Sequence, residues 1–132
     1  MKKLTLLVLL TFSLSSNLFA NRILIPMNET QRNHLKAYGI AFWLLKTHGT
    51  EVEWLLNYKG GSFLFTASQT FINECVIRGV SYEVISEAES QSILNLIASN
   101  DANMDAVKLN KAPKIAVYSP KTTQPWDDAV TL

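Results

Sequence analysis

The chain has 132 residues, which is the size of one ordinary domain. Nearly half of its residues (48%) are apolar and 17% are charged, so the chain can form a hydrophobic core and differs from a disordered tail. Its formal net charge is +1 and no basic stripe runs along it, which argues against a nucleic-acid partner.

The first 20 residues (1–20) have the three parts of a secretory signal peptide. Residues 1–3 are a short basic start, residues 4–14 are almost wholly apolar, and residues 15–20 are polar and end on Ala20. We predict cleavage after Ala20 and export to the periplasm or the extracellular space. The apolar run of 11 residues is shorter than the roughly 20 that span a bilayer, so we expect no stable membrane insertion after cleavage. The alternative is a buried N-terminal helix.

A strand and a long helix are predicted next. Residues 22–26 are a short apolar run that ends at a proline, as in a buried strand. Asn28, with Gln31 three residues later, is a variant of the capping box and predicts a helix start. Gly49 is a suitable helix end. Between them, apolar residues recur at spacings of three and four and predict one inward-facing helical face, widened by their apolar neighbours: Leu35, Tyr38, Phe42 and Leu45, with Ile40, Trp43 and Leu44.

Strands and helices then alternate. Residues 51–56 alternate and turn wholly apolar, which predicts a strand ended by Gly60-Gly61, and residues 62–65 form a second strand or line a loop. A helix is predicted at residues 70–78 and a strand at residues 80–85. Further predictions are a helix that begins at residues 86–89, a connection at 99–112, a clear strand at 114–118 and a helix at 125–130.

This alternation predicts an α/β fold over residues 21–132, with a mainly parallel sheet flanked by helices, as in flavodoxin-like or class I amidotransferase-like domains. The last predicted helix has only begun at Leu132. We therefore expect the domain to be incomplete at its C-terminus and to be the N-terminal part of a longer protein. The alternative is a short terminal helix that docks on the sheet.

Several segments resemble the N-terminal part of a family of exported bacterial proteins usually labelled asparagine synthetase B. The most specific are residues 31–39 (QRNHLKAYG), 54–63 (WLLNYKGGSF) and 125–132 (PWDDAVTL). The resemblance spans essentially the whole mature chain. It implies a longer protein with an amidotransferase-like activity that resides beyond the end of this chain.

The residues themselves depart from those of a glutamine-dependent asparagine synthetase. Such an enzyme exposes a cysteine at its N-terminus, whereas Lys2 follows the initiator methionine here and Asn21 follows the predicted cleavage site. Its Ser-Gly-Gly-x-Asp-Ser loop, which binds pyrophosphate, is also absent, because Gly60-Gly61-Ser62 has another order and lacks the acid. The sequence therefore does not predict the synthetase reaction.

No complete catalytic or metal site is visible in the sequence. Cys75 lies inside a predicted helix without the flanking glycines of a nucleophile elbow, so we interpret it as a core residue. The only histidines, His34 and His48, lie near opposite ends of the first predicted helix and cannot share a metal. We predict no catalytic residue, no metal and no cofactor among these residues.

Two loops are candidate ligand-binding sites. Gly60 and Gly61 follow a predicted strand and could present backbone N–H groups to an anion, although a plain turn explains them equally well. The loop at residues 119–124 follows the clearest strand and precedes a helix N-terminus. The candidates in and after this loop are Ser119, Thr122, Asp127 and Asp128. Two hypotheses remain: an exported amidotransferase-like protein, or a non-catalytic envelope module that binds a small molecule or a protein partner.

Overall fold

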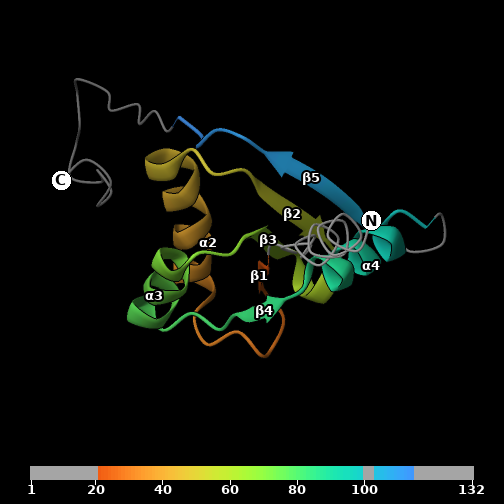
Figure 1. Cartoon of the computed structure of the whole chain (residues 1–132), viewed down its shortest axis with the longest axis horizontal. Coiled ribbons are helices and arrows are strands. Elements are labelled where there is room, and N and C mark those ends of the chain that lie inside the picture. The colour runs from red at the N-terminus through yellow and green to blue at the C-terminus, as the bar shows by residue number, and fades with distance from the viewer. Residues whose placement is uncertain (1–20, 100–102, 115–132) are drawn as a thin grey trace, which may run out of the picture.

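The computed structural model describes residues 21–99 and 103–114, and Figure 1 shows how their helices and strands are arranged. The strands are β1 (Arg22–Ile25), β2 (Val52–Leu56), β3 (Ser62–Thr66), β4 (Glu83–Ile85) and β5 (Asp105–Leu109). The helices are α2 (His34–Trp43), α3 (Gln69–Arg78) and α4 (Glu87–Ile97). A π-helical turn (Leu44–His48) extends α2, and a 3-10 turn (Tyr58–Gly60) joins β2 to β3. None of the helices in these two ranges is long and apolar enough to cross a bilayer.

The five strands form one sheet in the order β4-β1-β3-β2-β5, and every neighbouring pair is antiparallel. The prediction of a mainly parallel sheet flanked by helices is therefore wrong. The likeness to flavodoxin-like or class I amidotransferase-like domains, which rested on that sheet, has no support in the described residues.

The strand directions explain the error. Because β1 and β2 both run antiparallel to β3, they point the same way, as strands joined by a helix are expected to do. However, the short β2–β3 turn folds β3 back between them. In the same way β1 separates β3 from β4, the pair that α3 connects. Each helix thus joins strands of one direction, but no two such strands are neighbours.

The predicted connection at residues 99–112 is also wrong, because β5 lies within it and pairs with β2 along its whole length, from Val52↔Leu109 to Leu56↔Asp105. Three of the five residues of this edge strand are exposed (Asp105, Ala106 and Lys108), and it lacks the apolar run that marks the central strands β1 and β3. Its stability therefore depends on pairing with β2. The strand predicted at 114–118 and the helix predicted at 125–130 lie outside the described residues, apart from Lys114.

The sheet separates two hydrophobic clusters because successive side chains of a strand point to opposite faces. Ile23, Ile25, Phe63 and Phe65 pack with buried residues of α2 and α3 on one face. Leu24, Leu55 and Leu64 pack on the other face with Ile93 and Ile97 of α4. The central strands β1 and β3 are apolar on both faces, since helices cover both.

The first helix starts later than predicted. Its N-cap is Asn33, whose side chain accepts a hydrogen bond from the Lys36 backbone N–H at 3.1 Å. Gln31 is instead buried in the preceding loop, where it donates to the Pro26 carbonyl at 2.8 Å and accepts from the Ser81 backbone N–H at 2.9 Å. It therefore joins the loops before α2 and β4 and caps no helix.

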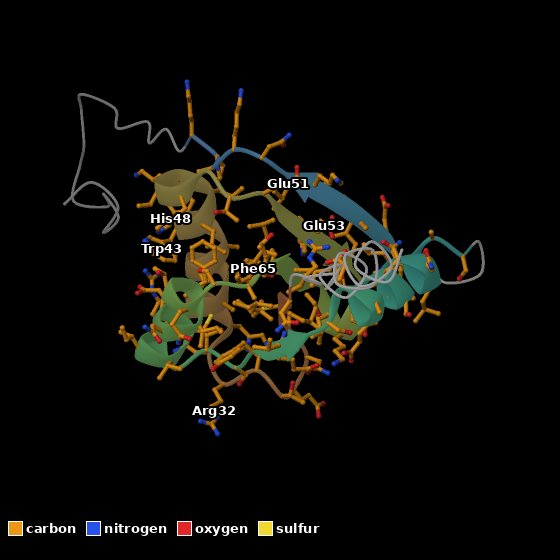
Figure 2. The ribbon with its side chains drawn as sticks, viewed as in Figure 1. Arg32, Trp43, His48, Glu51, Glu53 and Phe65 are labelled. Carbon is orange, nitrogen blue, oxygen red and sulfur yellow. The ribbon has the colours of Figure 1, made fainter. Side chains whose placement is uncertain are left out.

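The sheet face that α4 covers contains a buried ion pair. Glu53 Oε2 lies 3.2 Å from Arg22 Nη1, and their side chains are only 10% and 15% exposed. Arg22 also donates to Ser90 Oγ of α4 at 3.2 Å. The approach of the guanidinium to Oε2 does not have hydrogen-bond geometry, and Oε2 receives no other hydrogen bond from the described residues. Attraction between charges, rather than a hydrogen bond, therefore joins the pair. Figure 2 shows Glu53 in the sheet, away from Trp43 and His48 at the end of α2.

Candidate functional site

The structure places Gly60 and Gly61 in the β2–β3 turn, where both have a positive φ (82° and 94°). A Cβ atom on Gly60 would lie 2.5 Å from the Met27 carbonyl oxygen. This close approach is held by a hydrogen bond from the Met27 N–H to the Lys59 carbonyl at 2.9 Å. The turn geometry and this packing account for both glycines without a ligand. The other predicted ligand-binding residues, Ser119, Thr122, Asp127 and Asp128, lie outside the described residues.

Cys75 is fully buried in α3. Burial, together with the nearby Glu74 carboxylate, raises the pKa of its thiol to about 11, although Arg78 acts in the opposite direction. A catalytic cysteine requires the reverse, a lowered pKa and access to substrate. Within the described ranges, no hydrogen bond joins Cys75 to a histidine. Its environment is that of a core residue.

The two histidines lie at opposite ends of α2, as predicted. His34 Nε2 is 3.1 Å from the Met27 carbonyl oxygen at the start of the helix. His48 packs edge-on against Trp43 and Phe71, with ring centroids 4.4 Å and 5.2 Å apart. No three His, Cys, Asp or Glu residues in the described part of the chain are grouped closely enough to hold a metal ion.

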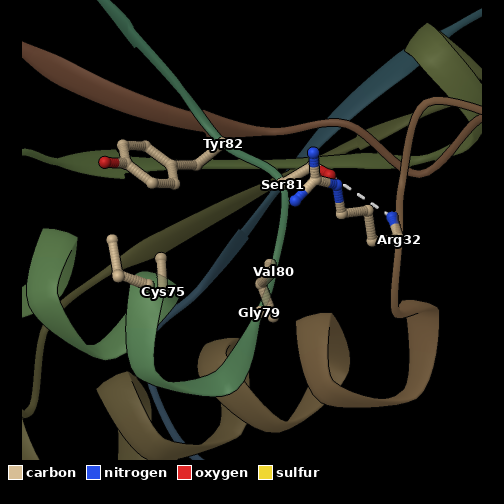
Figure 3. Close-up of a pocket in the computed structure, with 7 residues that line it drawn as sticks. Arg32, Cys75, Gly79, Val80, Ser81 and Tyr82 are labelled. Carbon is tan, nitrogen blue, oxygen red and sulfur yellow. Dashed lines mark hydrogen bonds between the residues drawn. The ribbon is translucent and has the colours of Figure 1, made fainter.

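A polar cleft of about 380 Å³ lies between the C-terminal turn of α3 and the loop before α2 (Figure 3). Arg32 lines it and donates a backbone hydrogen bond to Ser81 Oγ at 3.3 Å. Arg32 could attract an anion, but the carbonyl end of α3 has partial negative charge and opposes one. A second cavity, of about 460 Å³, lies between α4 and β5, beside the undescribed residues 100–102. Neither cleft brings together groups that could catalyse a reaction.

The helical face predicted to turn inward is buried only towards its C-terminal end, where Leu45 is buried and Phe42 is half-buried. Leu35 is 84% exposed and Tyr38 is 49% exposed, whereas Ala37, Ile40 and Leu44 form the face that packs on the sheet. The helix α2 and its π-helical turn therefore carry two apolar faces. The face with Leu35, Tyr38, Phe42 and Leu45, here called the α2 seam, has no helix packed over it among the described residues.

Beside the seam lies an apolar groove of about 300 Å³, here called the α2 groove. One wall comes from α2 and its π-helical turn, and the other from β2, β3 and the chain after β5. Its lining is almost entirely apolar and half aromatic: Tyr38, Ala41, Phe42, Leu45, Trp54, Phe63, Leu109 and Pro113.

Contacts between aromatic rings fix the shape of this groove. The Phe63 ring lies edge-on to Tyr38, with centroids 5.5 Å apart, and is stacked with Trp54 at 6.1 Å. Trp54 Nε1 also donates to the Gly61 carbonyl at 3.1 Å, which orients the indole ring. The β2–β3 turn thus holds one wall of the groove in place. These hydrogen bonds and ring contacts indicate a surface that exists before a partner binds.

Three exposed lysines, here called the lysine rim, belong to the segments that line the groove. Lys46 Nζ lies 5.4 Å from the centroid of the Phe42 ring, and Lys111 and Lys114 lie on either side of Pro113 in the sequence. All three are exposed, and none lies within 4.0 Å of a described carboxylate. Glu51, which directly precedes β2, is engaged with Lys108 at 3.3 Å.

Sequence reasoning identified the seam but not the groove. The spacing of Leu35, Tyr38, Phe42 and Leu45 was visible, and so was the apolar character of β2 and β3. Trp54, Phe63 and Leu109 come from three strands, and only the sheet order brings them to one wall. No family model, no curated protein and no solved structure matches this chain.

Proposed function

We propose that the described part of this chain is a non-catalytic module of an exported protein, and that it binds another polypeptide through the α2 groove. The observation that carries the proposal is the exposed seam and groove, which are apolar, half aromatic and rimmed by lysines. Contiguous apolar surface of this kind, with a polar rim, is typical of interaction sites on soluble proteins. Aromatic residues are also enriched where binding energy concentrates.

The chemistry of the described residues favours binding over catalysis. An acyl-transfer enzyme needs a nucleophile beside a general base. The thiol of Cys75 is buried with a raised pKa, and the contacts of His34 and His48 are to a carbonyl oxygen and to aromatic rings. The amidotransferase-like activity implied by the family resemblance stays a hypothesis about residues other than these.

A polypeptide fits the groove better than a small molecule does. Small-molecule pockets enclose most of the ligand surface. Tyr38, at the centre of this surface, remains half exposed, and the apolar stripe continues along α2 to Leu35, beyond the groove itself. An open strip of this length suits several side chains of one partner.

Site-specific photo-crosslinking tests the proposal. A photoreactive phenylalanine analogue is placed at Tyr38 or Phe42 of the full chain in the cells that produce it, and adducts are identified by mass spectrometry. Ile77, which is 77% exposed on α3, is the matched control, because it is an exposed apolar helical residue outside the groove. We expect one defined polypeptide adduct at Tyr38 and Phe42 and none at Ile77.

The identified partner is then purified and titrated against the full chain. Phe42→Ser should weaken binding by about tenfold or more, since a central aromatic contact contributes at least about 1.4 kcal/mol. Ile77→Ser should leave the affinity unchanged. Equal crosslinking at all three positions, or affinity that is insensitive to Phe42→Ser, would contradict the proposed function.

A further inference from the structure

We infer that the partner contributes a single amphipathic helix, which lies along α2 in the groove and has an acidic flank facing the lysine rim. This inference rests on the proposed function, which it makes more specific. Three observations support it: the spacing of the residues in the α2 seam, the distance of the groove from the edge of the sheet, and the positive charge of the lysines at its rim.

The α2 seam has the spacing that a partner helix requires. Leu35, Tyr38, Phe42 and Leu45 are separated by three, four and three residues, the alternation found at the a and d positions of coiled coils. In the structure this spacing runs from α2 into its π-helical turn and spans about 15 Å at 1.5 Å per residue. The stripe is open at Leu35 and Tyr38, half-buried at Phe42 and buried at Leu45, where it enters the groove. A helix of about three to four turns matches this length.

The position of the groove across the sheet favours a helix over an added strand. Its floor includes Phe63 of β3, which lies two strands inward from β5 at the sheet edge. Because neighbouring strands are about 4.8 Å apart, the outer edge of β5 is more than about 9 Å from this ring. A strand added to β5 would reach Leu109 but would leave Tyr38, on the far side of Phe63, uncovered. A helix packed on the face would cover both Leu109 and Tyr38.

The volume of the groove agrees with this arrangement. Its 300 Å³ would hold about ten water molecules at their volume in liquid water. Packed helices interdigitate their side chains, with axes about 8–10 Å apart. A few apolar side chains of the partner would displace this water, while its backbone stayed outside the groove.

The positive charges of the lysine rim favour a partner helix that has acidic residues beside its apolar face. Lys46, Lys111 and Lys114 carry positive charge, and no described carboxylate pairs with them. Glu53, although it belongs to β2, points to the opposite face of the sheet, towards Arg22. Complementary charges of this kind favour an acidic partner and disfavour a basic one. Their effect weakens with salt, because the lysines are exposed.

Two designed peptides of about 18 residues test the inference, a length that supports helix formation. Both carry the same leucine seam, but one has glutamates on its flanks and the other has lysines. Binding of each to the full chain is measured by fluorescence anisotropy, and circular dichroism reports peptide helicity. We expect the glutamate peptide to bind about tenfold tighter than the lysine peptide at about 0.02 M salt, with little difference near 0.5 M.

Substitutions in the full chain separate the apolar contribution from the electrostatic one. Phe42→Ser should weaken binding of both peptides, whereas replacing Lys46, Lys111 and Lys114 by glutamine should abolish only the preference for glutamate. Ile77→Ser should change neither. Circular dichroism spectra of each variant check that it remains folded, and Tyr38→Ser provides a second groove variant should Phe42→Ser unfold.

Four results obtained with the peptides or the chain, and a fifth given last, would overturn the inference. The first is equal affinity for the two peptides at low salt, and the second is binding without gain of helicity. The third is an intramolecular crosslink from Tyr38 to residues 115–132, which would make the chain itself the occupant. The fourth is self-association that Tyr38→Ser abolishes, which would make a second copy the occupant. If neither peptide binds but Tyr38 crosslinks to a foreign polypeptide, the inference fails while the proposed function stands.

Discussion

Removing Glu53 should destabilise the protein much more than removing Glu51, although both acids belong to the same segment. Glu53 and Arg22 form a pair whose side chains are 10% and 15% exposed, on the sheet face that α4 covers. In Glu53→Leu the Arg22 guanidinium keeps its contact with Ser90 Oγ but loses the neighbouring negative charge. Breaking a buried pair in this way costs about 3–5 kcal/mol. We expect about 3 kcal/mol here, because both side chains retain some solvent contact.

Urea unfolding of the full chain, followed by tryptophan fluorescence, measures this cost. With a slope of about 2 kcal/mol per molar urea, a loss of 3 kcal/mol lowers the midpoint by about 1.5 M. Glu51→Leu is the matched control, because Glu51 pairs with Lys108 at 3.3 Å but the two side chains are 50% and 67% exposed. Exposed pairs contribute about 0–1 kcal/mol, so its midpoint should move by less than about 0.5 M.

The double variant Arg22→Met, Glu53→Leu tests whether charge is responsible. Replacing both partners by apolar residues leaves no buried charge without a counterion, so stability should return to within about 1 kcal/mol of the wild type. Glu53→Gln keeps the shape and should still cost about 2 kcal/mol, because the interaction is Coulombic rather than a hydrogen bond. If Glu53→Leu costs no more than Glu51→Leu, or if the double variant is less stable than either single variant, the reasoning is refuted.

Four further outcomes are expected. Gly60→Ala should lower the free energy of unfolding in urea by about 3 kcal/mol, because its φ is positive and the new Cβ would meet the Met27 carbonyl. Gly49 also has a positive φ but has open space around it, so Gly49→Ala should cost only about 1 kcal/mol. Asn33→Ala should lose about 1 kcal/mol, as removal of an N-cap does. The Cys75 thiol should react with iodoacetamide at pH 8 at least about 100-fold more slowly in the native than in the urea-unfolded chain, since raising its pKa to about 11 lowers the thiolate fraction about 100-fold. The pKa of this thiol is higher in the folded chain than in the unfolded chain, so its contribution to the free energy of unfolding is present below about pH 9 and decreases towards pH 11. A Cys75→Ala variant should lack this decrease.

The polypeptide-binding proposal and the Glu53 prediction concern opposite faces of the same sheet. The face with α4 is closed by Leu24, Leu64 and Ile93, and its buried charges are paired. The face with α2 is closed only in part, because α2 and α3 cover β1 and β3 while Trp54 and Leu109 stay half-buried. A variant that alters the groove should therefore change binding more than folding, and a variant at Glu53 should do the reverse.

Some features of this protein follow from the sequence alone because they depend on neighbouring residues. Gly49 ends its helix as predicted, and Gly79 directly follows the predicted helix at residues 70–78; both are left-handed, because glycine adopts a positive φ at low cost. The strand β1 and the helices α3 and α4 also lie where the pattern of apolar residues predicted them. The first cap was missed because Asn28 and Asn33 are both suitable caps, and the buried contacts of Gln31 with a loop 50 residues away decide between them.

Only the tertiary structure decided which strands are neighbours and which apolar face stays open. Strand–helix alternation fixes the direction of successive strands but not their order, so the return of β3 between β1 and β2 was not predictable from it. The edge strand β5 has only a short periodic signal, the half-buried Val107 and Leu109, and is stabilised by pairing with β2. The periodicity of Leu35, Tyr38, Phe42 and Leu45 predicted an inward-facing stripe, which the structure buries at Leu45 and leaves open at Leu35 and Tyr38. Which residues pack against this stripe depends on segments far away in the sequence. Among the described residues, Trp54, Phe63 and Leu109 lie beside the seam but leave Leu35 and Tyr38 uncovered.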